Sequence, residues 1–238
     1  MLIGDVLLVT GQSKLSVGLV AAQKAIYKEA KSSHVEFGLG DGFFIHATND
    51  GGVHLSFLLD ELENCNSDWR VIRLTNLKEG EREQLVKSAL YFLRQGYNKV
   101  YMGEGTEHSS FCSELVAKAY KKAGLPVIDG KMPSKVAPAH FDKEADALIE
   151  WANVTNEYRD RLAEMEKDRP LYRMVLNHLQ GSFAMRHMAS QARGSIFQVM
   201  EMLSEHDENS KLREVFQDVK QQLREKRELH FWDENDES

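Results

Sequence analysis

Cys112 begins a helical pattern in the stretch SSFCSELVAKAYKKAGL, residues 109–125. An apolar stripe from Leu115 to Tyr120 follows it at helical spacing. A thiol at a helix N-terminus meets free backbone N–H groups and the positive end of the helix dipole, and both favour the nucleophilic thiolate. The two serines before it suit a helix cap. A lone cysteine there is more often a buried structural residue, so the nucleophile hypothesis requires a base nearby.

Two histidines lie in a predicted hairpin that precedes this helix. His34 begins the alternating stretch HVEFGLG, His46 lies in FFIHAT, and a GDG turn separates the two runs. Antiparallel pairing can place both side chains on one face of adjacent strands. One histidine could then act as the base for Cys112 while the other orients it, which is the cysteine form of a nucleophile–base–orienter triad. With this pattern, we favour Cys112 as a nucleophile.

Other titratable residues have competing interpretations. Glu36 shares the face of His34 by the period of two and is a rival orienter, although a solvated strand glutamate is the favoured interpretation. His54 and His108 are expected in surface loops, where His108 could still border the cleft. Cys65 is expected to be an inert or surface thiol.

The first and last parts of the chain differ in pattern. Short strand-like runs such as GDVLLV and WRVIRL alternate with helical windows before residue 143, and three of the four prolines fall within residues 125–140. We expect an α+β domain over residues 1–143, a helical extension over 144–229 and an acidic, disordered tail over 230–238. The run LYRMVLNHLQGSFAMRHM is expected to be helical core, with a partner-binding or acyl-binding methionine face as the alternative.

Composition excludes several classes of function. The net charge of -7 argues against non-specific nucleic-acid binding. No apolar run approaches the roughly 20 residues of a transmembrane helix, and MLIGDVLLVTGQSK lacks the basic and long apolar regions of a signal peptide. No cysteine–histidine spacing resembles a zinc site, so we expect no metal and no cofactor. We expect a protein made in the cytoplasm.

Four segments resemble the permuted NlpC-type, papain-like cysteine hydrolases of the YiiX-like group: GDVLLV, SSHVEFGLGDGFFIHA, SSFCSELVAKAYKKAGL and PSKVAPAHF. In that family the histidine strand precedes the cysteine helix, the reverse of the order in papain. The resemblance covers residues 1–143 and implies an antiparallel sheet packed on the nucleophile helix.

By position in this resemblance, Cys112 matches the nucleophile and His34 matches the base. Many members have glutamate in an IEA context where this chain has IHA, so His46 takes the third position. A histidine there is similar to the lecithin:retinol acyltransferase branch of the superfamily. Asp5 follows a GD pattern common in the family. It either faces the site and meets a cationic substrate group, or serves a turn or cap.

The resemblance implies a cysteine hydrolase that works through an acyl-thioenzyme, with an amidase or peptidase acting on peptide or amino-acid amides as the first choice. A lipid esterase or acyltransferase with the same Cys-His-His site is the alternative, and a non-catalytic binding module is the alternative of another class. The helical extension would offer a surface to a protein partner. Its fusion to a hydrolase suits a bacterial toxin-type effector delivered without a signal peptide, and equally a cytosolic housekeeping amidase.

Overall fold

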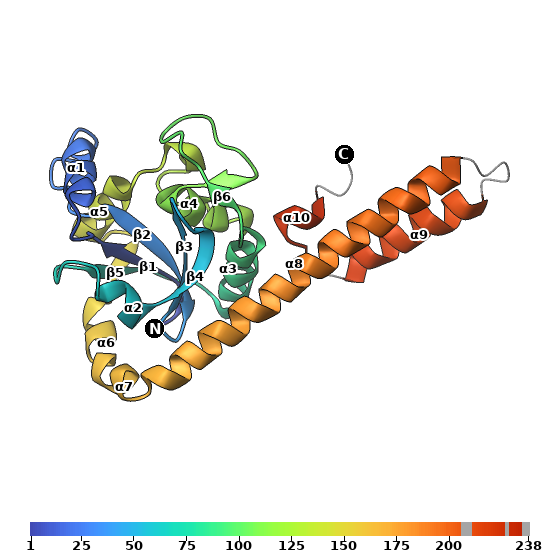
Figure 1. Cartoon of the computed structure of the whole chain (residues 1–238). Helices are drawn as coiled ribbons and strands as arrows, with labels where there is room; N and C mark the ends of the chain where they lie inside the picture. The colour runs from blue at the N-terminus through green and yellow to red at the C-terminus, as the bar shows by residue number, and fades with distance from the viewer. Residues whose placement is uncertain (206–210, 227–228, 235–238) are drawn as a thin grey trace. The chain divides into compact units, whose positions relative to one another are not determined.

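Six strands pair in the order β4-β3-β2-β1-β5-β8 within residues 1–176, and each pairing is antiparallel (Figure 1). They are β1 (Ile3–Val9), β2 (His34–Gly40), β3 (Phe43–Thr48), β4 (Gly52–Phe57), β5 (Arg70–Leu74) and β8 (Trp151–Asn153). Asp41 and Gly42 join β2 to β3 with φ angles of 49° and 82°. Positive values at both central residues are those of a type I′ hairpin turn. The predicted hairpin is therefore confirmed.

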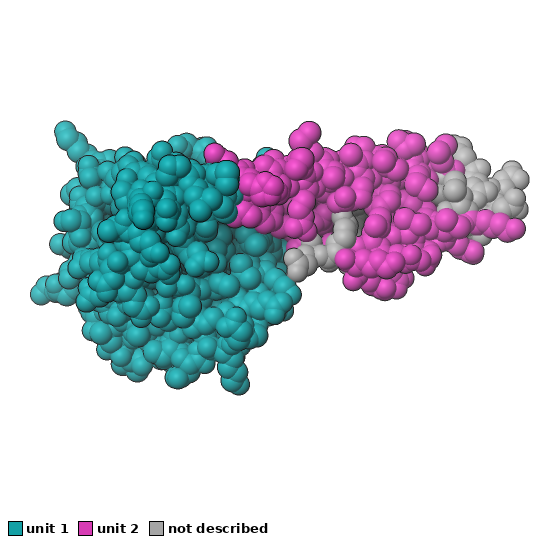
Figure 2. All heavy atoms as spheres, turned by 90° about the horizontal axis from the view of Figure 1, so that it is seen from below, with its two compact units in different colours: residues 1–176 teal, residues 177–238 magenta. Residues whose placement is uncertain are grey.

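The structure is a computed structural model that describes residues 1–205, 211–226 and 229–234. Its contacts divide the chain into two units, Met1–Leu176 and Asn177–Ser238 (Figure 2). The sheet of the first unit is accompanied by α1 (Lys14–Gln23), α2 (Leu58–Leu62), α3 (Glu79–Tyr91), α4 (Cys112–Lys122), a 3₁₀ turn (Pro133–Lys135), α5 (Pro138–Ala147), α6 (Thr155–Arg159), α7 (Leu162–Lys167) and the small parallel pair β6 (Gly96–Tyr97) and β7 (Ser109–Ser110). The predicted α+β class is confirmed. Within the described ranges, no helix is both long and apolar enough to cross a membrane.

Helix α4 begins at the predicted nucleophile and packs on β2, β3 and α3. Its N-cap is Phe111, and the two preceding serines form β7 instead of a cap. The buried Glu114 carboxylate takes the capping role, because its Oε2 accepts from the backbone N–H of Phe111 at 3.3 Å and from Nδ2 of Asn98 at 2.9 Å. Lys118 lies 3.0 Å from the other oxygen. These contacts fix the first turn of α4, which carries Cys112.

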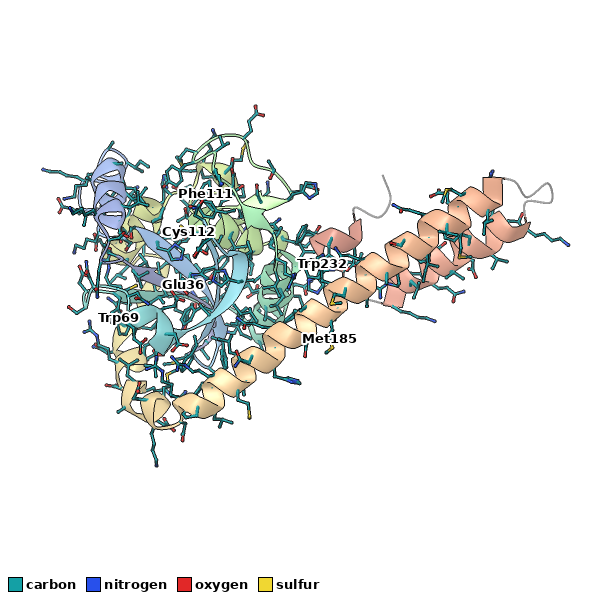
Figure 3. The ribbon with its side chains drawn as sticks, viewed as in Figure 1. Glu36, Trp69, Phe111, Cys112, Met185 and Trp232 are labelled. Atoms are coloured by element: carbon teal, nitrogen blue, oxygen red, sulfur yellow. The ribbon has the colours of Figure 1, made fainter. Side chains whose placement is uncertain are left out.

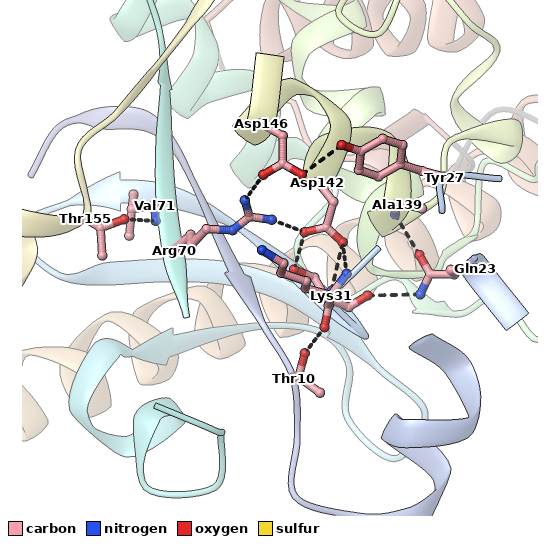
Figure 4. Close-up of polar contacts among 11 residues, drawn as sticks. Thr10, Gln23, Tyr27, Lys31, Arg70, Val71, Ala139, Asp142, Asp146 and Thr155 are labelled. Carbon is pink, nitrogen blue, oxygen red and sulfur yellow. Dashed lines mark hydrogen bonds and ion pairs between the residues drawn. The ribbon is translucent and has the colours of Figure 1, made fainter. Parts of the chain in front are cut away.

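A second buried carboxylate anchors the segment that leads into β2 (Figure 4). Asp142 of α5 accepts hydrogen bonds from the backbone N–H groups of Lys31 and Ser32, both at 2.8 Å. The same carboxylate pairs with Arg70 of β5 at 2.6 Å. Because Ser32 is held in place, so is His34, which begins β2 two residues later.

The first unit continues beyond the predicted boundary at residue 143. Strand β8 pairs with β5, and its Trp151 is buried against Tyr120 of α4, with ring centroids 5.8 Å apart. The unit ends at Leu176, so the predicted helical extension over 144–229 begins with a strand and two short helices that complete the first unit. A strand of three residues is too short to show an alternating pattern, which is why the sequence boundary falls too early.

Asp5 lies in a buried ion pair and does not line the cavity described below. Arg73 of β5 donates through Nε to Oδ1 at 2.6 Å and through Nη2 to Oδ2 at 2.8 Å. Tyr158 of α6 donates its hydroxyl to Oδ2 at 2.6 Å. The structure therefore corrects the substrate-binding role expected for Asp5: its carboxylate joins β1, β5 and α6.

The second unit is built from long helices. Helix α8 (Arg169–Glu205) begins in the first unit, and α9 (Lys211–Lys226) runs back along its later part (Figure 1). The two helices are in contact through the rings of Phe197 and Phe216, whose centroids lie 5.4 Å apart. Helix α10 (Phe231–Glu234) forms inside the tail that was expected to be disordered, and residues 235–238 of that tail lie outside the described residues.

The methionine-rich run is helical, as predicted, but its methionines are not core. Met174, Met185 and Met188 are 62%, 66% and 67% exposed (Figure 3 labels Met185). The predicted core role of this run is therefore wrong for these side chains.

We predict that Asp5→Asn lowers the free energy of unfolding by about 3 kcal/mol, because it leaves the Arg73 guanidinium without its buried partner. Glu157→Gln is the matched control, since Glu157 pairs with the same arginine at 2.9 Å but is half exposed, and its loss should cost less than about 1 kcal/mol. Urea unfolding followed by tryptophan fluorescence measures both. Equal stability of Asp5→Asn and wild type, with weaker substrate binding, would restore the substrate-binding role.

Candidate active site

Cys112, His34 and His46 line one cavity of about 360 Å³. Cys112 enters from the N-terminus of α4 (Figure 3). The histidines enter from β2 and β3. The three residues expected to do chemistry therefore share one cavity. Its wall also includes residues that were not expected at the site, which are Leu15, Leu19, Glu61, Cys65, Tyr97 and Tyr101 among others.

The pairing of β2, β3 and β4 places a row of polar side chains on one face of the sheet. His46 and His54 are direct register partners on β3 and β4. Extending the β2–β3 register by one residue places Glu36 opposite His46. His34 lies two residues before Glu36 and so shares its face. The row thus follows from strand register alone.

Hydrogen bonds join three histidines in a chain. His54 donates from Nδ1 to the carbonyl oxygen of Gly52 at 3.0 Å, since a carbonyl can only accept. In the neutral ring, Nε2 of His54 must then accept, at 2.9 Å, from Nε2–H of His46. This leaves Nδ1 of His46 to accept from Nε2–H of His34 at 3.0 Å. The neutral His34 ring therefore carries its lone pair on Nδ1, which has no hydrogen-bond partner among the described residues.

Glu36 lies beneath this chain as a buried carboxylate. Its Oε2 accepts from the hydroxyl of Ser56 at 2.9 Å. Its Oε1 lies 3.3 Å from Nδ1 of His46 and 3.9 Å from Nε2 of His34. Glu36 is fully buried, so the favoured expectation of a solvated strand glutamate is wrong. His46, at hydrogen-bond distance, is the direct partner of His34, and Glu36 is the second neighbour of both rings.

Burial controls the charge states of this cluster. The pKa of His34 is lowered to about 4, chiefly by desolvation and also by the neighbouring His46, while the charge of Glu36 opposes the shift. Desolvation also lowers the pKa values of His46 and His54. Burial raises the pKa of Glu61 to about 7, with the charge of Glu36 adding to the rise. At neutral pH the three imidazoles are therefore uncharged, as the hydrogen-bond chain requires.

The thiol of Cys112 is also neutral in this state. Burial raises its pKa to about 11, although the backbone N–H groups of Val35 and Ser113 favour the thiolate. The hydrogen bonds within the described residues include none between Sγ of Cys112 and either His34 or His46. The expectation that the helix N-terminus lowers this pKa is outweighed by desolvation. The cavity thus holds a neutral thiol and a neutral imidazole, not an ion pair.

His54 and Cys65 lie at the site, although the sequence did not place them there. His54 belongs to β4 and to the histidine chain, so the surface-loop expectation is wrong for it; its position opposite His46 becomes visible only with the strand register. Cys65 is half-buried in the cavity wall, and burial raises its pKa to about 12. Cys65 is therefore an uncharged thiol at neutral pH, and its lack of reactivity stays a prediction. His108 is exposed, as expected, and does not line the cavity.

A comparison with known protein families matches most of the first unit. A family model described as permuted papain-like amidase enzyme, YaeF/YiiX, C92 family, matches residues 4–166. Among solved structures, the chain is similar to YiiX from Escherichia coli O157:H7, described as a metalloprotein, with 20% identity and a TM-score of 0.43. That match covers 51% of this chain and 66% of YiiX, slightly less than two thirds of its length. No curated protein matches the chain.

The family match spans well over half of the chain and includes Cys112, the three histidines and the sheet that carries them. It also runs past residue 143 to include β8 and α6, in agreement with the extent of the first unit. The chain therefore belongs to the YaeF/YiiX family of permuted papain-like amidases.

Proposed function

We propose that the chain is a cysteine amidase that cleaves peptide or amino-acid amides through an acyl-thioenzyme on Cys112. The observation that carries this proposal is the histidine chain, because it fixes His34 in the tautomer whose Nδ1 is free to take a proton in the cavity shared with Cys112. His34 is then the base, and His46 and His54 are positioning residues.

Attack and proton transfer occur together in this mechanism, because both groups begin neutral. Nδ1 of His34 takes the thiol proton as Sγ of Cys112 bonds to the amide carbon. The backbone N–H of Cys112, in the first turn of α4, is free of the helix ladder and can donate to the oxyanion. The imidazolium gives its proton to the leaving amine. Water, activated by the same ring, then cleaves the thioester.

Glu36 stabilises the charge that forms on His34. Its Oε1 lies 3.9 Å from Nε2 of that ring, and its charge favours the imidazolium. His46 contributes no charge of its own but accepts the Nε2–H hydrogen bond. A histidine at the third position therefore works together with a buried glutamate from the neighbouring strand, which supplies the charge that a glutamate at position 46 would supply.

The cavity wall favours a small amide with an apolar or aromatic acyl group. The volume of about 360 Å³ lies near the lower end of ordinary ligand sites. Leu15 and Leu19 of α1, together with Tyr97 and Tyr101, give the wall an apolar side. The family description names an amidase, which supports amides and gives no support to the lipid ester alternative.

We predict that Cys112→Ala abolishes hydrolysis of aromatic amino-acid anilides while it lowers the free energy of unfolding by about 1 kcal/mol or less. Acid-quenched mass spectrometry of the wild type should find the acyl group on the peptide that contains Cys112. Wild-type turnover by the variant, or acylation of Cys65 in its place, would contradict the mechanism.

We expect kcat/KM to decline on the acid side of its pH profile only near pH 4. His34 must be neutral to accept a proton, and its pKa is lowered from 6.5 to about 4. We therefore predict that kcat/KM stays level as the pH falls through 6.5 and declines only as it approaches 4. The unfolded chain binds protons below pH 6.5, so stability also falls in this window, and circular dichroism must show folded protein at each point.

Glu61→Gln is the control for this profile, because it removes the Glu61 titration near pH 7 from the window. A decline of kcat/KM near pH 6.5 in both proteins would mean that the base titrates as an ordinary exposed histidine.

Substitution of His54 tests the tautomer chain at its far end. His54→Gln keeps an oxygen that can accept from Nε2–H of His46, whereas His54→Leu does not. We predict that the leucine variant loses about tenfold or more in kcat, with KM little changed, and that the glutamine variant recovers much of the loss. Thermal unfolding of both variants controls for stability. Equal impairment of the two would mean that His54 acts only through packing.

A further inference from the structure

Three side-chain atoms of the candidate site lie close together and have a single hydrogen among them. Nε2 of His34, Nδ1 of His46 and Oε1 of Glu36 lie 3.0, 3.3 and 3.9 Å from one another. In the tautomer chain only Nε2 of His34 carries a hydrogen here, so two acceptors face one donor. Oε1 of Glu36 is buried and accepts no hydrogen bond from a backbone, amide or alcohol donor among the described residues.

A divalent transition-metal ion fits the space between these atoms. A triangle with these three sides has a point about 2.0 Å from each corner, and zinc bonds to imidazole nitrogen and carboxylate oxygen are about 2.0–2.2 Å long. No other group of three or more histidine, cysteine, aspartate or glutamate ligands in the described ranges lies this close together. Cys112 is not a member of the group.

Of the two imidazole ligands, His46 already offers a lone pair on Nδ1, whereas Nε2 of His34 must lose its hydrogen to solvent before it can bind, and that ring then takes a hydrogen on Nδ1. The chain from Gly52 through His54 leaves Nδ1 of His46 as a lone pair, ready to bind a metal ion. Two neutral imidazoles and one carboxylate form a donor set that suits Zn²⁺ and Co²⁺ better than Mg²⁺ or Ca²⁺, which prefer oxygen. A fourth position remains for water, since His34 opens onto the cavity.

We infer that His34, Glu36 and His46 form a binding site for a zinc-class divalent ion, and that occupancy of this site switches off the base. A neutral imidazole bound to metal through Nε2 carries its hydrogen on Nδ1. His34 in that state cannot take the proton of Cys112. The second half of this inference rests on the proposed function, whereas the metal site itself stands on the geometry.

The spacing of residues in the sequence does not show this site. The absence of a zinc-like cysteine–histidine spacing led us to expect no metal. The three ligands come from two neighbouring strands, two residues apart on β2 and across the pairing on β3. Strand pairing, not a local motif, brings them together.

Cobalt binding by the untagged full chain tests the site directly. Titration with Co²⁺ should give visible absorption bands that saturate at one ion per chain, that Zn²⁺ abolishes and that excess Mg²⁺ leaves unchanged. Glu36→Gln should weaken binding by about tenfold or more. Cys112→Ser should bind as the wild type does, and His108→Ala is the matched control with an exposed histidine removed.

Histidine C–H resonances supply a second readout that needs no variant. In the wild type, Co²⁺ should shift the signals of His34 and His46 and leave that of His108 in place. Zn²⁺ should inhibit amide hydrolysis, with recovery on chelation. No saturable binding, binding unaffected by Glu36→Gln, or a cobalt–thiolate band that Cys112→Ser removes would overturn the site. Tight binding without inhibition would support the metal site but overturn the inference that its occupancy switches off the base.

Discussion

The hydrogen bond from Nδ1 of His54 to the carbonyl of Gly52 determines which ring nitrogen carries the hydrogen in each of the three histidines. A carbonyl accepts and cannot donate, so the neutral ring of His54 must accept at its other nitrogen, and the constraint passes through His46 to His34. A backbone carbonyl on the edge strand β4 thus determines which nitrogen of the His34 ring is basic. Desolvation reinforces the chain, because it keeps all three imidazoles uncharged at neutral pH.

Two buried carboxylates fix the backbone segments that carry Cys112 and His34. Glu114 fixes the first turn of α4 and thereby Cys112, and Asp142 fixes the segment that enters β2 and thereby His34. Each acts through backbone N–H groups, so the positions of the proposed nucleophile and the proposed base depend on main-chain contacts. In both proposals Glu36 supplies the negative charge, to a forming imidazolium in one case and to a bound cation in the other, and either positive charge would oppose the rise that burial causes in the pKa of Glu36.

The sequence was sufficient to predict the hairpin, helix α4 and three candidate residues that the structure brings into one cavity. The period of two in HVEFGLG and FFIHAT, with Asp41 and Gly42 at the turn, predicts the hairpin, and helical spacing after Cys112 predicts α4. It was insufficient wherever the answer depends on pairing. Strand β8 has three residues and no pattern of its own, Asp5 finds its partner on another strand, and His54 joins the site only through register with His46. Burial also reverses the expected shift of the Cys112 pKa, and burial is a property of the packed molecule.

The central claim is that the strand network fixes His34 with its proton on Nε2 and its lone pair on Nδ1. Nitrogen-15 NMR of the metal-free chain at neutral pH measures this directly, since protonated and unprotonated ring nitrogens have well-separated chemical shifts. The account predicts the Nε2–H form for His34 and His46 and the Nδ1–H form for His54. A His34 ring protonated on Nδ1, or an imidazolium at neutral pH, would contradict it.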